Sequence, residues 1–236
     1  LLLNMSAYDV RNPALNPVEF QTPLQHQNLE LVKDGRLNFA IVFDENAEKH
    51  LRYPNQKGIR SAVNTLIREL KRTILLTKPW VRFGISPFGI YRNKKSTADG
   101  SGSNTNGLQN YDDLYADITY WVQQGWIDYN IPQIYWEIGH PAADYITLIK
   151  WWDKNANGGH LYIGQDVART MKADQLTRKM RYERALPHVS GNCFWPANEI
   201  LWNNKGVADS LKRNYHRYPA LIPAYTHMHN RPPKDV

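Results

Sequence analysis

The sequence has little or none of several features that mark common protein classes. Its 236 residues include one cysteine, Cys193, which excludes an intrachain disulfide framework and a cysteine-based metal cluster. No apolar run approaches the roughly 20 residues that cross a bilayer, so we expect no transmembrane segment. The leucines at residues 1–3 are too few for the core of a signal peptide. Because the chain begins without Met, we expect a mature or trimmed product.

Sequence motifs for metal, nucleotide and nucleophile chemistry are also missing. The histidines show no HExxH or comparable ligand spacing, and two of them, His227 and His229, fall near the C-terminus. Ser86 lies in residues 84–89 (GISPFG), which lack the GxSxG spacing of a nucleophile elbow. No phosphate loop of the GxGxxG or Walker type occurs. We therefore expect no metal site, no cofactor and no nucleotide chemistry.

Positive charge is present but is not concentrated in one tract. The net charge is +7, and the densest basic spots are short, at residues 94–95 and between Arg231 and Lys234. Scattered basicity is weaker evidence for nucleic-acid binding than a patterned basic face, so we expect no nucleic-acid partner. An anionic polymer such as a cell-wall glycan would be attracted by the same field. An ordinary solvated surface is the alternative interpretation.

Apolar runs bounded by turn residues alternate with segments of helical periodicity, which predicts an α/β protein with a parallel sheet. The chain is long enough for one well-buried domain and short for a complete (β/α)8 barrel. We expect about five strands, which is fewer than eight. The predicted strands are residues 37–43, 81–86, 129–135, 160–164 and 189–194, and the predicted helices are residues 59–76, 111–124, 142–154, 173–185 and 207–215.

The ends of the chain are predicted to lie outside this regular pattern. Residues 1–36 contain several X-Pro pairs and are expected to form a loop or an extended arm. Residues 37–225 form the predicted domain, and residues 226–236 a tail. Within the domain, residues 95–106 have loop composition, and a loop of that length is often functional.

Consecutive predicted strands carry polar and aromatic residues at the same end. Strands in a (β/α) barrel place their carboxyl ends at one rim, where active sites are built. We therefore expect the strands that begin near Val81, Tyr129, His160 and Val189 to be parallel neighbours in that order. The residues expected at the common rim are Ser86, Tyr135, Gln165 and Trp195.

Four motifs together resemble one protein family. They are residues 83–93 (FGISPFGIYRN), 107–117 (GLQNYDDLYAD), 132–136 (PQIYW) and 161–164 (LYIG). These look like the glycosyl hydrolase-like 10 family, formerly a domain of unknown function, over roughly residues 55–223. The resemblance implies a (β/α)8 TIM barrel that acts on glycans, with some members linked to peptidoglycan. It also implies a bacterial protein of the periplasm, the cell surface or the secreted fraction, and residues 137–145 look most like the Bacteroidetes branch.

The sequence departs from the family pattern in its N-terminal part. Family members carry an earlier strand that ends in a motif of the type DGxxFDDYF, whose acidic pair is the leading candidate for catalysis. Residues 34–35 and 43–45 echo this motif with different spacing. We therefore expect a barrel that is incomplete at its N-terminal half, through truncation or divergence. A sheet that cannot close has an exposed edge, which the arm or a second copy of the chain is expected to cover.

Two carboxylates are the predicted catalytic pair. Glycoside hydrolysis uses two carboxyl groups that flank the bond. Glu137 ends a predicted strand beside aromatic residues, where an apolar wall favours a general acid. Its alternative role is to cap the next helix. Asp166 follows another strand end and is the predicted partner, with a helix N-cap as the alternative. Asp44 and Glu45 are a third possibility.

Aromatic and amide side chains are the predicted glycan-binding groups. Sugar rings stack on aromatic rings, while amides and Arg bind hydroxyls. Arg92 suits a carboxylate on a cell-wall sugar, and a salt bridge that braces the long loop is its alternative. The predicted binding residues are Tyr91, Arg92, Asn93, Gln133, Tyr135, Trp136, Gln165 and Trp195. The predicted function is a glycoside hydrolase acting on a bacterial cell-wall or other polysaccharide, with a non-catalytic carbohydrate-binding barrel remnant as the alternative.

Overall fold

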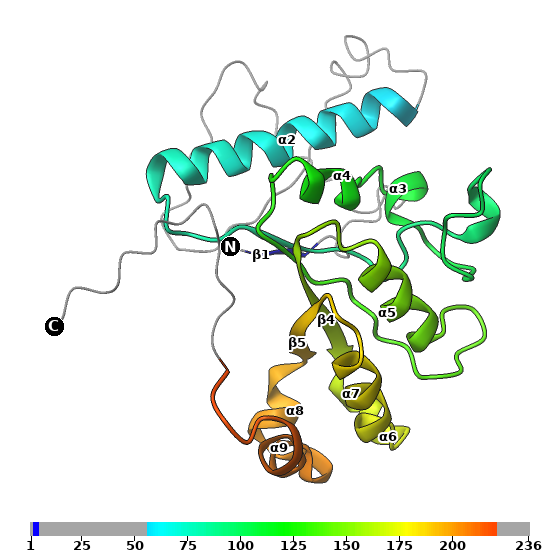
Figure 1. Cartoon of the computed structure of the whole chain (residues 1–236), viewed down its shortest axis with the longest axis vertical. Coiled ribbons are helices and arrows are strands. Elements are labelled where there is room, and N and C mark those ends of the chain that lie inside the picture. The colour runs from blue at the N-terminus through cyan, green and yellow to red at the C-terminus, as the bar shows by residue number, and fades with distance from the viewer. Residues whose placement is uncertain (1, 5–55, 221–236) are drawn as a thin grey trace, which may run out of the picture.

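The computed structural model describes residues 2–4 and 56–220 and shows an α/β fold built on one parallel sheet (Figure 1). The strands are β1 (Leu2–Asn4), β2 (Gly84–Ser86), β3 (Tyr129–Asn130), β4 (His160–Asp166) and β5 (Val189–Trp195). Their order in the sheet is the same as their order in the chain, and every neighbouring pair is parallel. The predicted parallel order of the last four strands is therefore confirmed.

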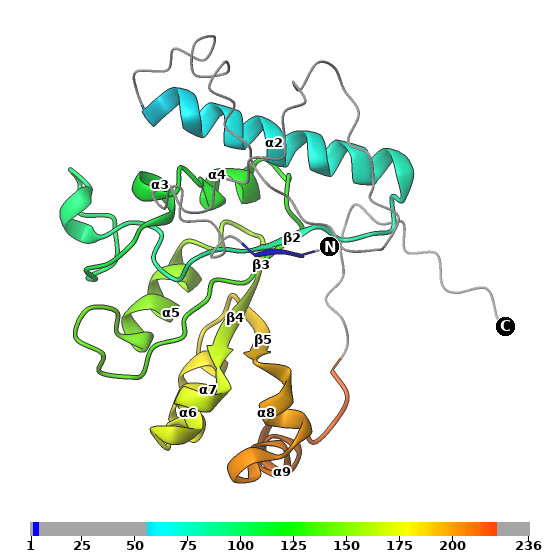
Figure 2. The same ribbon diagram turned by 180° about the vertical axis from the view of Figure 1, so that it is seen from behind.

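Helices connect the strands in the alternating pattern that parallel pairing requires. They are α2 (Gln56–Thr77), α3 (Asn110–Asp113), α4 (Ile118–Gln123), α5 (Tyr145–Lys154), α6 (Val167–Lys172), α7 (Leu176–Arg184), α8 (Ala197–Leu201) and α9 (Val207–Ser210), with short turns η3 (Lys94–Ser96), η4 (Asn204–Gly206) and η5 (Leu211–Tyr215). In Figures 1 and 2 these helices follow one another around one side of the sheet, from α2 at the top to α8 and α9 at the bottom.

The main core lies between the sheet and the helices on that side. Side chains alternate across a strand, so Phe83 and Ile85 at β2, and Leu161 and Ile163 on β4, share the helix-facing side and are buried. Helices α4 and α5 complete this core with residues that include Trp121, Leu148 and Trp152. Each such side chain contributes about 1.5–3 kcal/mol when it leaves water. This burial holds α2, α4 and α5 against the sheet.

A buried ion pair ties the longest helix to the amino-terminal end of the sheet. Lys71 of α2 binds both oxygens of Asp128, at 2.6 and 2.7 Å. Asp128 also accepts a hydrogen bond of 2.7 Å from the backbone N–H of Phe83. These contacts lie just before β3, at the end of the sheet opposite to the carboxyl ends of the strands.

Several elements of the structure differ from those predicted. The helix predicted over residues 111–124 is wrong: it is two helices, α3 and α4, separated by a left-handed residue, Tyr115 (φ 54°). Asp117 then starts α4 by accepting a hydrogen bond from the N–H of Tyr120. Strand β3 is shorter than predicted because Pro132 follows it and interrupts the hydrogen-bond ladder. Strand β2 is shorter than the predicted strand 81–86, and helices α6 and α8 were not predicted.

Some predictions concern residues outside the described ranges. The strand predicted over residues 37–43, the candidates Asp44 and Glu45, and the tail from residue 226 all lie there. Of the predicted arm, residues 2–4 are described, and they form β1 beside β2. Among the described helices, none combines the length and apolar character that crossing a bilayer requires.

Candidate active site

The carboxyl ends of β2 to β5 form one rim, and the segments that leave them lie against each other. Isolated bridges join Phe88, after β2, to Gln133, after β3, and join Gln133 to Gly164 on β4. Asp166 ends β4 directly opposite Trp195, which ends β5. The chain therefore brings the segment 131–138 to the middle of this rim.

Two glycines allow this close approach. A Cβ atom on Gly164 would lie 2.8 Å from the carbonyl oxygen of Pro132, and one on Gly89 would lie 2.5 Å from that of Gln133. Both distances are shorter than real Cβ atoms tolerate. Any other residue at these positions would push the segment after β3 away from the sheet.

Glu137 lies on this segment with its side chain half-buried. The preceding residue, Trp136, packs edge-on against Phe88 with ring centroids 5.7 Å apart. The carbonyl oxygen of Glu137 accepts a hydrogen bond of 3.2 Å from the N–H of His140. The alternative role of Glu137, the N-cap of the following helix, belongs to Asp144, whose side chain accepts from Thr147 N–H at 2.8 Å.

Asp166 is the N-cap of α6, which was the alternative role predicted for this residue. One carboxylate oxygen accepts a hydrogen bond of 2.9 Å from the N–H of Arg169. The other lies 3.4 Å from the guanidinium of the same residue. These contacts hold the carboxylate at the end of β4, on the side of the strand opposite to Ile163 and Gln165.

A buried lysine contacts the backbone next to Glu137. Lys179 of α7 is fully buried and donates hydrogen bonds of 2.9 Å to the carbonyl oxygen of Trp136 and to the Thr170 hydroxyl. Burial lowers the pKa of its ammonium to about 8, while the carboxylates of Glu137 and Asp166 act to raise it. Glu137 and Asp166 are thus both within electrostatic reach of one cation.

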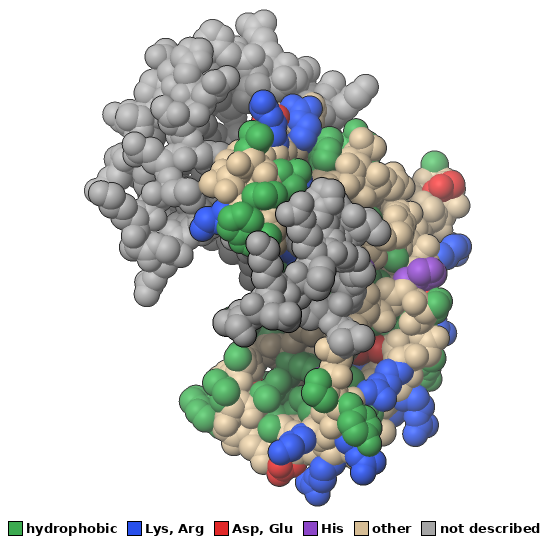
Figure 3. Space-filling model, turned by 60° about the vertical axis from the view of Figure 1, so that its left-hand side comes forward, with side chains coloured by type: hydrophobic (Ala, Val, Ile, Leu, Met, Phe, Trp, Pro, Cys, Tyr) green, Lys and Arg blue, Asp and Glu red, His purple; other side chains and the backbone are tan. Residues whose placement is uncertain are grey.

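Aromatic side chains surround the same rim. Tyr135 is half-buried, and burial raises the pKa of its phenol to about 12, with smaller contributions from Cys193 and Asp166. Trp195 is 59% exposed. Beyond it, Trp202 and Leu201 are also exposed, and a groove of about 350 Å³ runs between α6 and the α8 region. Figure 3 shows hydrophobic and basic side chains side by side at this lower end of the molecule.

The predicted binding residues after β2 are engaged in holding the long loop. Tyr91 donates a 2.7 Å hydrogen bond to Asp117 and stacks on Trp151. Arg92 binds both oxygens of Asp112, at 2.8 and 2.9 Å, and the carbonyl of Ser96. This salt bridge braces the long loop, which was the alternative role predicted for Arg92. Asn93 is buried and donates to the carbonyl of Gly107 at 2.8 Å. Ligand contact by these three residues stays a prediction.

The two predicted glutamines are buried. The Gln133 amide donates to the carbonyl oxygen of Ser86 at 2.9 Å, which joins the segments after β2 and β3. Gln165 faces the helices and donates to Glu183 at 2.7 Å and to Asn192 at 3.1 Å. In the structure these two side chains connect neighbouring segments of the rim by hydrogen bonds, and direct glycan contact stays a prediction.

The polar residues that α7 buries were not predicted as part of the site. Its buried face consists of Leu176, Lys179, Met180 and Glu183. The spacing of these four residues is that of a core-facing helix stripe, and charged residues in such a stripe were the available signal. Glu183 accepts hydrogen bonds from Tyr145, Gln165 and Asn192, and burial raises its pKa well above the ordinary value.

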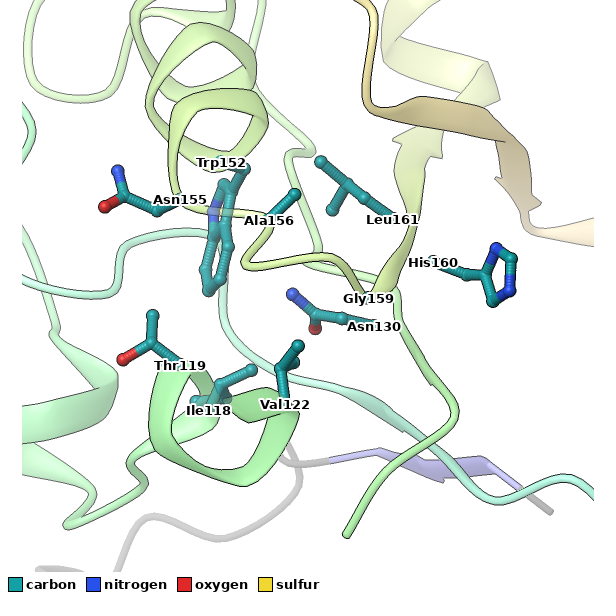
Figure 4. A pocket seen from close by; sticks show the side chains of 10 residues that line it. All are labelled: Ile118, Thr119, Val122, Asn130, Trp152, Asn155, Ala156, Gly159, His160 and Leu161. Carbon is teal, nitrogen blue, oxygen red and sulfur yellow. The ribbon is translucent and has the colours of Figure 1, made fainter. Parts of the chain in front are cut away.

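A small cavity at the other end of β4 is unsuitable for a ligand. Figure 4 shows it between α4, α5 and the start of β4, with Asn130 and Trp152 in its lining. Its volume of about 10 Å³ is that of about one water molecule. Among the described residues, no group of three or more His, Cys, Asp or Glu side chains is placed to hold a metal ion.

Comparisons with known proteins agree with the resemblance seen in the sequence. A family model described as glycosyl hydrolase-like 10 matches residues 40–180, which include Glu137, Asp166 and Lys179. The Bacillus subtilis (strain 168) protein named glycosyl hydrolase YngK is 40% identical over 186 residues, which cover 74% of this chain and 36% of the relative. Glycosyl hydrolase DigH of Escherichia coli (strain K12) is 37% identical over 151 residues, which cover 58% of this chain and 34% of the relative. The chain spans about a third of the length of these relatives.

Proposed function

Because the chain belongs to the glycosyl hydrolase-like 10 family, we propose that it is part of a glycoside hydrolase that acts on a bacterial cell-wall or other polysaccharide. Glu137 and Asp166 are the proposed catalytic residues. One observation carries this assignment: the two carboxylates follow neighbouring parallel strands, β3 and β4, at the same rim of the sheet. Two carboxyl groups at one site are what glycoside hydrolysis requires.

In the proposed reaction, the carboxyl group of Glu137 gives its proton to the glycosidic oxygen as the bond to the anomeric carbon breaks. The carboxylate of Asp166 either takes a proton from the water that attacks this carbon or bonds to the carbon itself. Tyr135 and Trp136 precede Glu137, and the exposed Trp195 lies opposite Asp166 across the β4–β5 pair. These rings would stack on the apolar faces of the sugars.

We further propose that the described strands belong to a (β/α)8-type barrel. The strands are consecutive, parallel and joined by helices on one side, and the candidate carboxylates follow their carboxyl ends, where barrel enzymes carry their active sites. The family also leads us to propose a location in the periplasm, at the cell surface or outside the cell.

A non-catalytic carbohydrate-binding protein is the second candidate. It is favoured by the role of Asp166 as a helix cap and by the departure of residues 34–45 from the acidic motif of the family. Such a protein would keep the aromatic groups and bind glycans without cleaving them.

The test compares the unchanged chain with Glu137→Gln on oligosaccharides from peptidoglycan and from plant polysaccharides. The amide retains the size of the acid but carries no proton to give, so we expect kcat to fall by about 100- to 10,000-fold while the calorimetric Kd changes little. Glu69→Gln, on the exposed face of α2, is the matched control. Equal turnover by Glu137→Gln would remove this residue from the mechanism. Binding without turnover by the unchanged chain would select the second candidate.

A further inference from the structure

Helix α7 holds the backbone on both sides of Glu137. On the N-terminal side, the Lys179 ammonium donates a 2.9 Å hydrogen bond to the carbonyl oxygen of Trp136. On the C-terminal side, the Gln175 amide accepts from the N–H of Ile138 at 2.7 Å and donates to its carbonyl oxygen at 3.2 Å. Gln175 and Lys179 lie one helical turn apart, at the start and middle of α7.

Burying a lysine at this place costs more free energy than burying an apolar side chain that only packs α7 against its neighbours. Lys179 is fully buried, and removing an ammonium from water costs several kcal/mol unless polar groups replace the water. The replacements are the Trp136 carbonyl, the Thr170 hydroxyl and the Tyr145 ring, whose centroid lies 4.2 Å from the ammonium. A leucine or methionine would fill the same place against the core of α7 without this cost.

The charged and titratable groups around Lys179 come from several elements. Glu137 follows β3, Asp166 ends β4, and Tyr145 belongs to α5. Glu183, one turn further along α7, is hydrogen-bonded to the hydroxyl of the same Tyr145. Burial lowers the pKa of the ammonium, and the carboxylates of Glu137 and Asp166 act to raise it.

We propose that Gln175 and Lys179 are positioning residues for the proposed acid, Glu137. They hold its backbone from both sides, through the carbonyl oxygen of Trp136 and the N–H and carbonyl groups of Ile138. This inference rests on the proposed function for its catalytic consequence. The hydrogen bonds to the backbone beside Glu137 are independent of any substrate, and so is the expected effect of the two carboxylates on the pKa of Lys179.

The first experiment measures the coupling without a substrate. The chain is labelled with carbon-13 at the lysine Cε atoms, Lys179 is assigned with Lys179→Met, and its titration is followed by NMR. We expect a pKa near 8 in the unchanged chain. It should fall in Glu137→Gln and in Asp166→Asn, because each variant removes a negative charge that favours the ammonium. Glu69→Gln should leave the pKa of Lys179 unchanged. An unchanged Lys179 titration in both carboxylate variants would overturn the proposal.

The second experiment measures turnover as a function of pH. Lys179→Met and Gln175→Leu should each lower kcat by about 10- to 100-fold, because both release the backbone beside the proposed acid. The decrease in kcat as pH rises through about 8 should persist in Gln175→Leu and disappear in Lys179→Met, since only the second variant removes the titrating group. Lys150→Met, on the exposed face of α5, is the matched control.

The two experiments separate the two proposals. If Lys179→Met does not fold, the titration of Lys179 in the carboxylate variants and the kinetics of Gln175→Leu still test the inference. Coupling in the NMR titration without turnover by the unchanged chain supports the positioning geometry and rejects the proposed function. Turnover in Gln175→Leu equal to that of the unchanged chain overturns the positioning role.

Discussion

At the scale of single residues, the unusual feature is the number of polar groups that α7 buries against the sheet. Lys179 and Glu183 occupy places that a core helix ordinarily fills with apolar side chains, and both are at most 2% exposed. Each is surrounded by hydrogen-bonding partners, as burial of such groups demands. Removing a hydrogen-bonding partner of Lys179 or Glu183 would leave the charged group buried without that hydrogen bond. Single substitutions here should therefore lower the free energy of unfolding strongly.

The buried Glu183 predicts a stability that depends on pH. Its folded-state pKa lies above the ordinary value of 4.5, so the folded protein binds the proton more tightly than the unfolded chain. The stability that the protonated Glu183 contributes is fully present below about pH 4.5 and is lost as pH rises through the folded-state pKa. Glu183→Gln should therefore gain stability relative to the unchanged chain between pH 5 and about pH 8. Urea unfolding at several pH values measures this difference.

Tyr145→Phe is the control for this prediction. It removes the hydroxyl that binds Glu183 but no group that titrates in this range, so it should lower the free energy of unfolding at every pH tested. If the difference between Glu183→Gln and the unchanged chain were the same at pH 5 and pH 8, the buried carboxyl would not be the titrating group.

At the scale of elements, the segment between β3 and α5 determines the geometry of the site. It leaves the sheet after Asn130, passes against Gly89 and Gly164, and reaches Glu137 before Asp144 starts α5. Its position depends on contacts with strands on both sides and with α7, not on a regular structure of its own. A change in any of these neighbours should therefore move Glu137.

Gly164→Ala should disturb this segment directly. The added methyl would lie 2.8 Å from the carbonyl oxygen of Pro132, which is backbone and cannot rotate away. We expect a loss of about 1–3 kcal/mol in the free energy of unfolding, as for other overpacked sites. In the control Gly107→Ala, the new methyl meets the side-chain end of Ile90 at 3.0 Å, which has more freedom to move. A loss in Gly164→Ala no greater than in this control would contradict the close packing described.

At the scale of the whole molecule, the described strands make an open sheet with β1 and β5 at its two ends. Strand β1 pairs in register with β2, from Leu2 with Gly84 to Asn4 with Ser86. An uncovered strand edge has free backbone groups that favour pairing with another chain. The N-terminal residues 2–4 therefore cover the edge of β2, and we expect them to limit association at that edge.

Removal of residues 1–4 tests this protection. Without β1, the edge of β2 loses its hydrogen-bonded neighbour, so we expect dimers or larger species at concentrations where the full chain is monomeric. Light scattering coupled to size-exclusion chromatography measures the change. A shortened chain with the same mass distribution as the full chain would show that β1 does not prevent association.

Much of the fold was predictable from the sequence because the relevant information is local. Apolar runs such as residues 160–164 and 189–194, separated by helical patterns, imply parallel strands, since parallel neighbours need a crossover between them. The same alternation implies that Glu137 and Asp166 follow the same end of the sheet. The interruption at Tyr115 was not predictable, because the apolar spacing of residues 111–124 continues across it.

The sequence by itself therefore determined the class of fold, the order of the last four strands and the end of the sheet that carries the candidate carboxylates, whereas β1 was not predicted as a strand. Only the tertiary structure decided which groups the polar side chains contact. Arg92 is bound to Asp112 and Lys179 reaches Trp136, contacts that span 20 and 43 residues of chain. No local pattern encodes such a pairing, because it depends on the distance at which α7 packs against the segment after β3. That distance is set by the burial of side chains from many elements at once.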